Sequence, residues 1–343
     1  MGPKTVCFGE LLLRLSAPLH ERLLQSPTLN ANFGGGEANV AVSLARFGLD
    51  SRFVTRLPDN AIGDVALRSL RAEGVAVDGV LRGGQRIGIY FSEAGASQRP
   101  SRVLYDRRHS AISELGPASI DWREALRDAS WFHTSGITPA LGRGVAGCTA
   151  SALAVAREGG ARVSFDLNYR RALWPEEEAQ RVVGPLMRHV NVLIANEEDL
   201  QTVLGVHVAR TDVTQGRLDV EAYRAAAEQV SEAHGIEFVA ITLRESLSAS
   251  ENGWSGLLYE RKSRVLYRAP RFVLQLVDRI GGGDAFAAGL IFGLVAGRSP
   301  RDALDFAVAA GALKQTIPGD YNRVSVEEVE LLAAGDTSGR VRR

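Results

Sequence analysis

Apolar positions near the start of the chain follow two periods in turn, as strands followed by helices do. A short apolar run at residues 6–8 stops at a glycine, which predicts a buried strand. Residues 38–47 and 62–73 have helical spacing and each end at a glycine, and a strand-like segment around residues 53–54 separates them. The order strand, helix, strand, helix indicates an α/β fold.

The period changes between Arg86 and Arg107. Ile87, Ile89 and Phe91 alternate with smaller or more polar residues, and a second strand-like run at 102–107 follows a loop of Gly, Ser and Pro. This pattern predicts a hairpin that stands apart from the alternating units. We expect a small β-sheet lid formed by about residues 11–33 and 85–110.

Alternation resumes after the hairpin and continues almost to the end of the chain. Strands are predicted at 131–133, 163–166, 190–195, 238–243, 256–260, 265–267 and 272–277, and helices at 146–158, 179–188, 220–233, from 285, 301–315 and 326–332. Repeated strand–helix units predict a mostly parallel sheet covered by helices on both faces. No linker interrupts the pattern, so we expect one domain over residues 1–335 and a disordered tail at 336–343.

The amino-acid composition excludes some classes of function and does not change the expected fold. The 343 residues are 45% hydrophobic, and 40 basic residues balance 40 acidic ones, so no net charge favours nucleic acid or a membrane surface. The two cysteines, Cys7 and Cys148, suit core packing in a reducing compartment. No apolar run is long enough to span a membrane and no signal region opens the chain, so we expect a cytoplasmic protein.

The segment at 277–289 carries the clearest chemistry. An apolar strand leads to Gly281, Gly282 and Gly283, and a helix rich in small residues follows. Successive glycine N–H groups at a helix N-terminus form an anion site, which suits the charge on a phosphoryl group in transfer. Asp284, beside that site, can accept a hydroxyl proton, and the helix dipole favours its ionised form.

This segment resembles the C-terminal signature of the ribokinase-like (PfkB) carbohydrate kinases, Asp-Thr-x-Gly-Ala-Gly-Asp-x-Phe-x-x-Gly. The matching residues are Asp278, Gly281, Gly283, Asp284, Phe286 and Gly289, while Arg279 replaces Thr and Gly282 replaces Ala. The resemblance implies a three-layer α/β/α core with a β lid. It also implies that Asp284 is the catalytic base and that residues 281–283 form the anion hole. A dinucleotide fingerprint or a P-loop fits poorly, because the required small residue or lysine is absent after each glycine run.

Two further segments favour a polar, anionic substrate. The run Gly34 to Asn39 resembles the family's N-terminal motif for sugar hydroxyls. Tyr105 and Arg107 share one face of the predicted lid strand, and Arg170 follows a strand at the edge of the sheet where ligands bind. Two arginines aimed at one substrate indicate a carboxylate, because a guanidinium pairs with it through two hydrogen bonds.

Motifs along nearly the whole chain are similar to the 2-keto-3-deoxygluconate kinase branch of this family. The resemblance implies substrate contacts at Gly35, Gly36, Asn39, Tyr90, Tyr105, Arg107, Arg170, Asp284 and Asp320. It implies ATP contacts at Asn168, Arg170, Asn196, Thr242, Arg244, Glu245, Ser246, Gly281, Gly282, Gly283 and Asn322. Mg²⁺ would be held by phosphates and water, with Asp199 near its coordination sphere and no direct side-chain ligand. A salt bridge between Arg244 and Glu245 is the alternative to a phosphate contact there.

The expected reaction is transfer of phosphate from ATP to the 6-hydroxyl of 2-keto-3-deoxygluconate. The alternatives are a fructokinase- or ribokinase-like enzyme for a neutral sugar, a nucleoside kinase, and a catalytically silent sugar-binding regulator. The related galactonate sugar and a monovalent cation beside the glycine loop are left open. Pairing of free lid edges between copies predicts a homodimer or a higher homo-oligomer.

Overall fold

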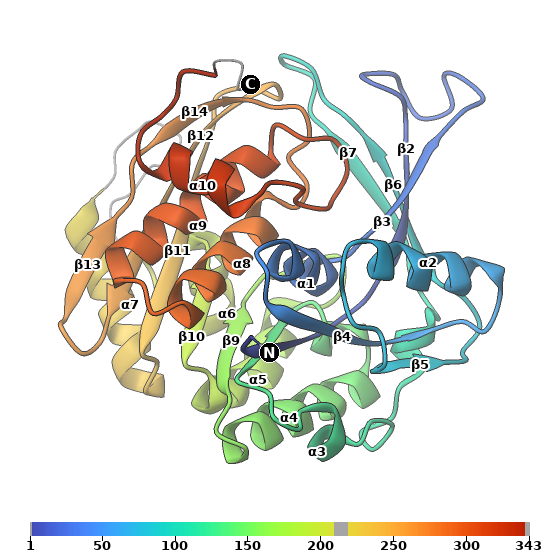
Figure 1. Ribbon diagram of the computed structural model, residues 1–343, viewed down its shortest axis with the longest axis horizontal. Coiled ribbons are helices and arrows are strands. Elements are labelled where there is room, and N and C mark those ends of the chain that lie inside the picture. Colours follow the sequence, from blue (N-terminus) through green and yellow to red (C-terminus); the bar gives the residue numbers. More distant parts are fainter. Residues whose placement is uncertain (1, 209–218, 340–343) are drawn as a thin grey trace.

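The computed structural model describes residues 2–208 and 219–339, and within them most strands belong to one ten-stranded sheet (Figure 1). Its strands are β1 (Lys4–Phe8), β4 (Asp50–Leu57), β5 (Val80–Arg82), β8 (Trp131–Ser135), β9 (Arg162–Asp166), β10 (Val192–Ala195), β11 (Phe238–Ser246), β12 (Glu251–Glu260), β13 (Val265–Arg268) and β14 (Phe272–Gln275). Their order is β13-β12-β11-β10-β9-β8-β1-β4-β5, and β14 also pairs with β12. All pairs from β11 to β5 are parallel, which confirms the mostly parallel sheet.

Helices cover both faces of this sheet, as expected for a three-layer α/β/α fold. One face carries α1 (Gly36–Arg46), α2 (Ala61–Ala72), α8 (Gly282–Val295), α9 (Pro300–Lys314) and α10 (Val326–Ala333). The other carries α3 (Trp122–Ala125), α4 (Arg143–Glu158), α5 (Glu176–Val183), α6 (Glu197–Leu204) and α7 (Val220–His234). Short 3₁₀ helices lie at η1 (Ala111–Glu114), η2 (Pro139–Leu141) and η3 (Gly184–His189). Each face has its own cluster of buried apolar side chains.

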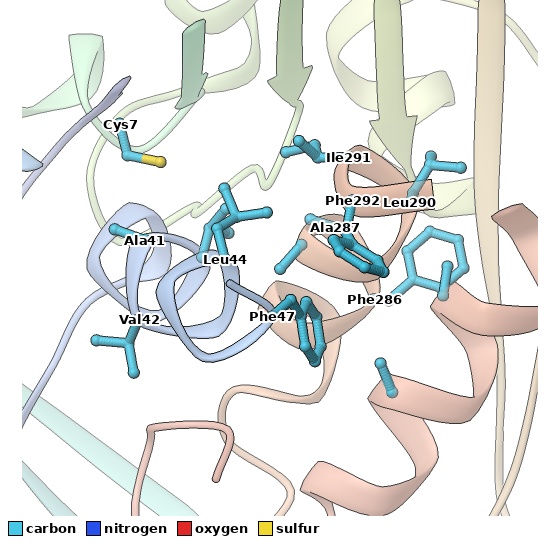
Figure 2. Packing of buried hydrophobic residues seen from close by; sticks show 14 of the residues in the cluster. Cys7, Ala41, Val42, Leu44, Phe47, Phe286, Ala287, Leu290, Ile291 and Phe292 are labelled. Carbon is cyan, nitrogen blue, oxygen red and sulfur yellow. The ribbon is translucent and has the colours of Figure 1, made fainter. Parts of the chain in front are cut away.

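Helix α8 packs closely against α9 because the two residues Gly289 and Gly293, which face α9, lack a side chain. A Cβ added to Gly289 would lie 2.8 Å from the Cα of Ala307, and one added to Gly293 would lie 2.8 Å from the Cα of Ala303. The ring of Phe47 at the end of α1 lies 5.3 Å from the ring of Phe292 on α8 (Figure 2). Helix α8 is therefore held between α1 and α9, which fixes the position of its N-terminus.

The lid is a separate four-stranded sheet of order β3-β2-β6-β7, visible beside the core in Figure 1. Its strands are β2 (Leu12–Ser16), β3 (Asn30–Gly34), β6 (Gly88–Glu93) and β7 (Arg102–Asp106). Strands β6 and β7 form the expected antiparallel hairpin, with Tyr90 opposite Tyr105. Strand β7 is the edge of this sheet and is exposed along its whole length.

The structure corrects the helix expected at 179–188. The α-helix α5 ends at Val183 and continues as the 3₁₀ helix η3, because Pro185 has no N–H group to extend the α-helical ladder. Helix α6 and strand β5 were not expected from the sequence, and the strand expected at 272–277 ends at Gln275. Of the expected tail, residues 340–343 lie outside the described residues. Among the residues that the structure describes, no helix has both the length and the apolar character to cross a membrane.

Candidate active site

A cavity of about 1230 Å³ lies between the lid, the ends of β9, β10 and β11, and the N-termini of α1 and α8. The predicted site residues that line it are Gly35, Gly36, Asn39, Tyr90, Tyr105, Arg107, Asn168, Arg170, Asn196, Asp199, Thr242, Arg244, Gly281, Gly282, Gly283, Asp284 and Asp320. Glu245, Ser246 and Asn322 were predicted ATP contacts, but they are not among its lining residues. Residues from several separate segments of the chain therefore meet at one cavity.

Asp284 lies in the first turn of α8 and is oriented from α1. The amide nitrogen of Asn39 donates a hydrogen bond to Asp284 Oδ2 at 2.7 Å, and the Asn39 oxygen accepts one from the N–H of Gly35 at 3.2 Å. A Cβ on Gly36 would lie 3.7 Å from Asp284 Oδ1 and 3.8 Å from the amide nitrogen of Asn168. Gly36 thus leaves open the space where a substrate hydroxyl can reach the carboxylate.

Burial is the largest influence on the pKa of Asp284. Removal from water raises the pKa of Asp284 to about 6, and the hydrogen bond from Asn39 and the charge of Arg170 act in the opposite direction. The expectation that the dipole favours the ionised form misses this upward shift in pKa. Asp284 is still mostly ionised at neutral pH, and it is a stronger proton acceptor than an ordinary aspartate.

The first glycine of the loop packs tightly against the protein, while the last has free space beside it. Gly281 has a φ of 85°, and a Cβ there would lie 2.2 Å from the backbone oxygen of Asp320. A Cβ on Gly283, by contrast, would have no neighbouring atom within 4 Å. The carboxylate of Asp278 accepts hydrogen bonds from the N–H groups of Ile280 at 3.1 Å and Gly319 at 3.0 Å, and so holds the start of the loop.

Asp320 is at the centre of a buried network between the lid and the core. Arg14, on β2, donates to it at 2.8 Å and also pairs with Asp278 at 2.8 Å. The Tyr90 hydroxyl donates to Asp320 at 2.5 Å, and the amide of Asn32 donates to it at 3.3 Å. Asp320 and Tyr90 were predicted to contact the substrate, and both already have protein partners that join the lid to the core.

Arg107 is already paired with a carboxylate. Glu10 accepts hydrogen bonds from Nε of Arg107 at 2.8 Å and from its Nη2, and it also accepts one from Ser110. The guanidinium carbon of Arg107 lies 5.2 Å from the centre of the Tyr105 ring, which is 48% exposed and faces the cavity. Glu10 therefore compensates the charge of Arg107, and the substrate contact at Arg107 stays a prediction.

Two further acidic residues, Asp166 and Asp199, lie in the same site as Asp284. Asp166, at the end of β9, has its pKa raised well above the ordinary value by burial and by the charges of Asp199 and Asp284. Burial raises the pKa of Asp199 to about 6, while Arg170 and the N–H of Tyr169 act to lower it. The positive charge of Arg170 thus faces three carboxylates as well as the cavity.

Two arginines on the β11 side of the cavity have few partners. Burial, and then the charges of Arg279 and Arg170, lower the pKa of Arg244. Arg279 donates to the side chain of Asn252 at 3.3 Å, and its buried Nε has no hydrogen-bond partner in the described part of the chain. The alternative salt bridge from Arg244 to Glu245 does not form, because Glu245 pairs with Arg271.

Several residues of the site were not identified from the sequence. Glu37 is buried and accepts hydrogen bonds from both the N–H and the hydroxyl of Ser135, which ties α1 to the end of β8. Glu37 lies inside the N-terminal glycine motif, and that position could have marked it as a site residue from the sequence alone. The roles of Glu10, Arg14 and Lys314 depend on partners far away in the sequence, so no local pattern marks them. The only sequence signal for Arg279 was that it replaces the threonine of the family signature.

No group of three or more His, Cys, Asp or Glu side chains in residues 2–208 and 219–339 is arranged to hold a metal ion. The groups that face the cavity between Asp284 and Arg279 are instead N–H donors and guanidinium groups. This donor set fits a phosphate chain that brings its own cation better than it fits a protein-bound metal.

Comparison with known proteins identifies the family of this chain. The structure of 2-dehydro-3-deoxygluconokinase from Thermotoga maritima superposes with a TM-score of 0.93 at 49% identity, over 98% of this chain and 99% of that one. The 2-dehydro-3-deoxygalactonokinase of Haloferax volcanii is 34% identical over 99% of both chains. The 2-dehydro-3-deoxygluconokinase of Bacillus subtilis is 29% identical over 94% of this chain and 93% of its own length. Residues 3–326 match the pfkB family carbohydrate kinase description, so the chain belongs to this family and is a phosphotransferase.

Proposed function

We propose that this kinase transfers the γ-phosphoryl group of ATP to the 6-hydroxyl of 2-keto-3-deoxygluconate. The observation that carries the proposal is the placement of Asp284 beside the open glycine loop, in hydrogen-bond contact with Asn39. A carboxylate so placed can accept the proton of a hydroxyl while the loop receives the phosphoryl group. The names of the relatives support a keto-deoxy sugar acid as the substrate.

In the proposed reaction the sugar hydroxyl oxygen attacks the γ-phosphorus in line with the bond to the leaving ADP. The new oxygen–phosphorus bond forms as the bond between the γ-phosphorus and the β–γ bridging oxygen breaks, and Asp284 takes the hydroxyl proton. The products are the sugar 6-phosphate and ADP. The N–H groups of Gly282 and Gly283 and the guanidinium of Arg170 stabilise the charge on the transferring group.

ATP and Mg²⁺ enter the proposal as a complex. Magnesium supplies neutralisation of the β- and γ-phosphate charge, with phosphates and water as its ligands. The residues that would face the phosphate chain are Arg244, Arg279 and the glycine loop, all of which line the cavity. Asp199 would lie near the metal, and its carboxylate accepts a hydrogen bond from the N–H of Tyr169 at 3.1 Å.

Recognition of the sugar acid rests on Arg107 and Tyr105. Glu10 engages Nε and Nη2 of Arg107, and Nη1 is not part of that pair. We infer that the substrate carboxylate binds at Nη1 and at the hydroxyl of Tyr105, with Arg170 supplying further positive charge. The Glu10 pair would then hold the guanidinium plane in a fixed orientation.

A neutral sugar is the second candidate, and the same ion pair favours it. Because Glu10 compensates the charge of Arg107, the lid carries less net positive charge than a carboxylate site would be expected to have. A ketose or pentose could use the Arg107–Glu10 pair as a set of hydrogen-bond donors and acceptors for its hydroxyl groups.

The deciding experiment measures ATP consumption with 2-keto-3-deoxygluconate, 2-keto-3-deoxygalactonate, fructose and ribose, for the native chain and for Arg107→Met. Turnover with the keto-deoxy acids, and a rise in their KM of at least about tenfold in Arg107→Met, is expected, as for loss of a charged hydrogen bond. Turnover limited to neutral sugars would overturn the substrate and keep the kinase. Turnover with the gluconate epimer alone would separate the two sugar acids.

We also propose that the chain forms a homodimer through its lid. Support comes from β7, an edge strand on which Leu104 is 58% exposed and Val103 is 39% exposed. Leu104→Lys should convert the dimer to a monomer, as measured by light scattering after size-exclusion chromatography. A native monomer would refute the proposal. The cytoplasmic location stays a prediction from the sequence.

A further inference from the structure

A lysine side chain is completely buried directly beneath the glycine loop. Lys314 is the last residue of α9, and none of its surface is exposed. A Cβ added to Gly281 would lie 3.0 Å from its Cε atom. A buried ammonium group is strongly destabilising unless it has polar partners, so the position of those partners indicates what it does.

The partners of Lys314 are backbone carbonyl oxygens from both segments that flank the loop. Its ammonium donates to the oxygen of Asp278 at 3.3 Å and to the oxygen of Ile317 at 3.2 Å. Asp278 begins the turn that leads to Gly281, and Ile317 begins the turn that leads to Asp320, whose carbonyl contacts the same glycine. The ammonium group of Lys314 therefore links two turns, one that ends at Gly281 and one that ends beside it.

Carboxylates surround this ammonium group, and they are paired elsewhere. Asp278 and Asp320 both bind Arg14 at 2.8 Å. Burial lowers the pKa of Lys314 and the charge of Arg14 acts in the same direction, while the charges of Asp278, Asp320 and Asp284 act to raise it. A compact positive charge held by carbonyl oxygens is the arrangement that a bound monovalent cation would adopt, here with the cation attached to the chain.

We propose that Lys314 is a positioning residue that serves as a built-in monovalent cation for the glycine loop. Its ammonium draws the carbonyls of Asp278 and Ile317 together, and it thereby keeps the N–H groups of residues 281–283 aimed at the arriving negative charge. The inference rests on the proposed function, in which this loop receives the phosphoryl group. It answers the question of a free monovalent cation, because the chain supplies the charge itself.

A purely structural role for Lys314 makes a different prediction. A basic residue at the end of a helix stabilises it through the helix dipole, and its loss would then lower the melting temperature without an effect specific to the loop. The experiment must therefore measure a property that a helix-terminal charge would not alter. Restoration of activity by a small free cation is such a property.

The test compares the native chain, Lys314→Ala and Lys314→Met in chloride salts of potassium, ammonium, methylammonium and tetramethylammonium at equal ionic strength. Lys314→Ala should lose about 10²-fold in kcat, because a small displacement of reacting groups has that effect. The KM for the sugar should stay nearly constant. Ammonium or potassium should restore kcat at least about tenfold and raise the melting temperature, and tetramethylammonium, too large for the vacated space, should do neither.

The Lys314→Met control fills the space without a charge, so it should be slow and should not be restored by any cation. A lower melting temperature in Lys314→Ala with unchanged kcat would overturn the proposal, and so would a loss of kcat that no cation restores. If neither variant folds, the native chain still decides, since clear activation by potassium over tetramethylammonium contradicts a built-in cation. Absence of turnover by the native chain with every sugar would count against the proposed function instead.

Discussion

The two sides of the cavity differ in how far their polar groups are already paired. On the sugar side, formed by the lid and α1, the side chains of Asn39, Tyr90 and Arg107 each bond to a carboxylate of the chain. On the nucleotide side, formed by the end of β11 and the turn before α8, Arg244 and Arg279 face each other with few partners.

This difference indicates what each side binds. Paired groups hold fixed orientations, which suits the recognition of hydroxyl groups at defined positions. Like charges close together destabilise the free protein, and a polyanion relieves that repulsion when it binds. The sugar side is therefore preorganised, while the arginines of the proposed nucleotide side repel each other, and ATP bound there as proposed would relieve that repulsion. Five substitutions test this contrast.

The largest effect is expected at Asp284, which lies between the two sides. Asp284→Asn should lower kcat about 10³-fold through loss of the base, with the KM values of both substrates nearly unchanged. Because the folded-state pKa of Asp284 is raised to about 6, its ionised form destabilises the fold above that pH. The variant should therefore be more stable at neutral pH, by about 1–3 kcal/mol in urea unfolding.

Asp128→Asn is the matched control for Asp284→Asn. Asp128 is exposed and has a φ of 61°, a conformation that asparagine also adopts readily, so this change should leave both kcat and stability unaltered. Near-native turnover in Asp284→Asn would remove Asp284 from the role of base.

The next largest effect is expected in the glycine loop, where a methyl group should lower kcat at one end and stability at the other. A methyl group at Gly283 meets no atom within 4 Å, so Gly283→Ala should fold normally and yet lose about 10–100-fold in kcat, since the methyl group takes the space of the phosphoryl group. Gly281→Ala should instead lower the free energy of unfolding by more than about 1 kcal/mol, because its φ is 85° and Asp320 is in the way. Equal melting temperatures for the two variants would contradict this assignment.

Arg279→Met tests the nucleotide side alone. Loss of a charged hydrogen bond to phosphate should raise the KM for ATP about 10–100-fold, while the KM for the sugar stays constant. The repulsion with Arg244 also disappears, so the variant should be at least as stable as the native chain in thermal unfolding. Arg271→Met, which breaks the ion pair with Glu245, is the control and should leave both KM values unchanged. A rise in the KM for the sugar would show that the two sides are not separable.

The smallest effect is expected on the sugar side, at Asn39. Its hydrogen bond lowers the pKa of Asp284, so Asn39→Ala should raise that pKa and move the acid limb of the kcat–pH profile upward from about pH 6. Because Asp284 accepts protons only when ionised, kcat at pH 7 should fall by less than about tenfold. Ser43→Ala, one turn further along α1, should leave the profile in place. An unshifted profile in Asn39→Ala would break the link between these two residues.

The sequence was sufficient for most elements of the fold and for the centre of the site. The strands and helices were predictable because their apolar periods are regular, and Asp284 with its glycines was visible because all the required residues are neighbours. The end of α5 was missed because the effect of Pro185 depends on the helix that precedes it.

Pairing across long distances in the chain was beyond the sequence. Nothing near Arg107 shows that Glu10, 97 positions earlier, compensates its charge. Likewise, the position of Lys314 at the end of a helix gives no sign that its ammonium meets carbonyls of two turns. In both residues the local pattern shows a cation, and only the fold determines whether that cation is available to a ligand.

The bridge from Arg14 to Asp320 also has a consequence for the synthesis of the chain. The two residues are 306 positions apart, so at about 5–20 residues per second the ribosome makes the acceptor roughly 15–60 s after the donor. Strand β2 is among the first elements to leave the exit tunnel, yet its arginine has neither of its carboxylate partners until Asp278 and then Asp320 are made near the end of synthesis. The lid, though encoded early, must therefore be among the last parts of the nascent protein to lock into place.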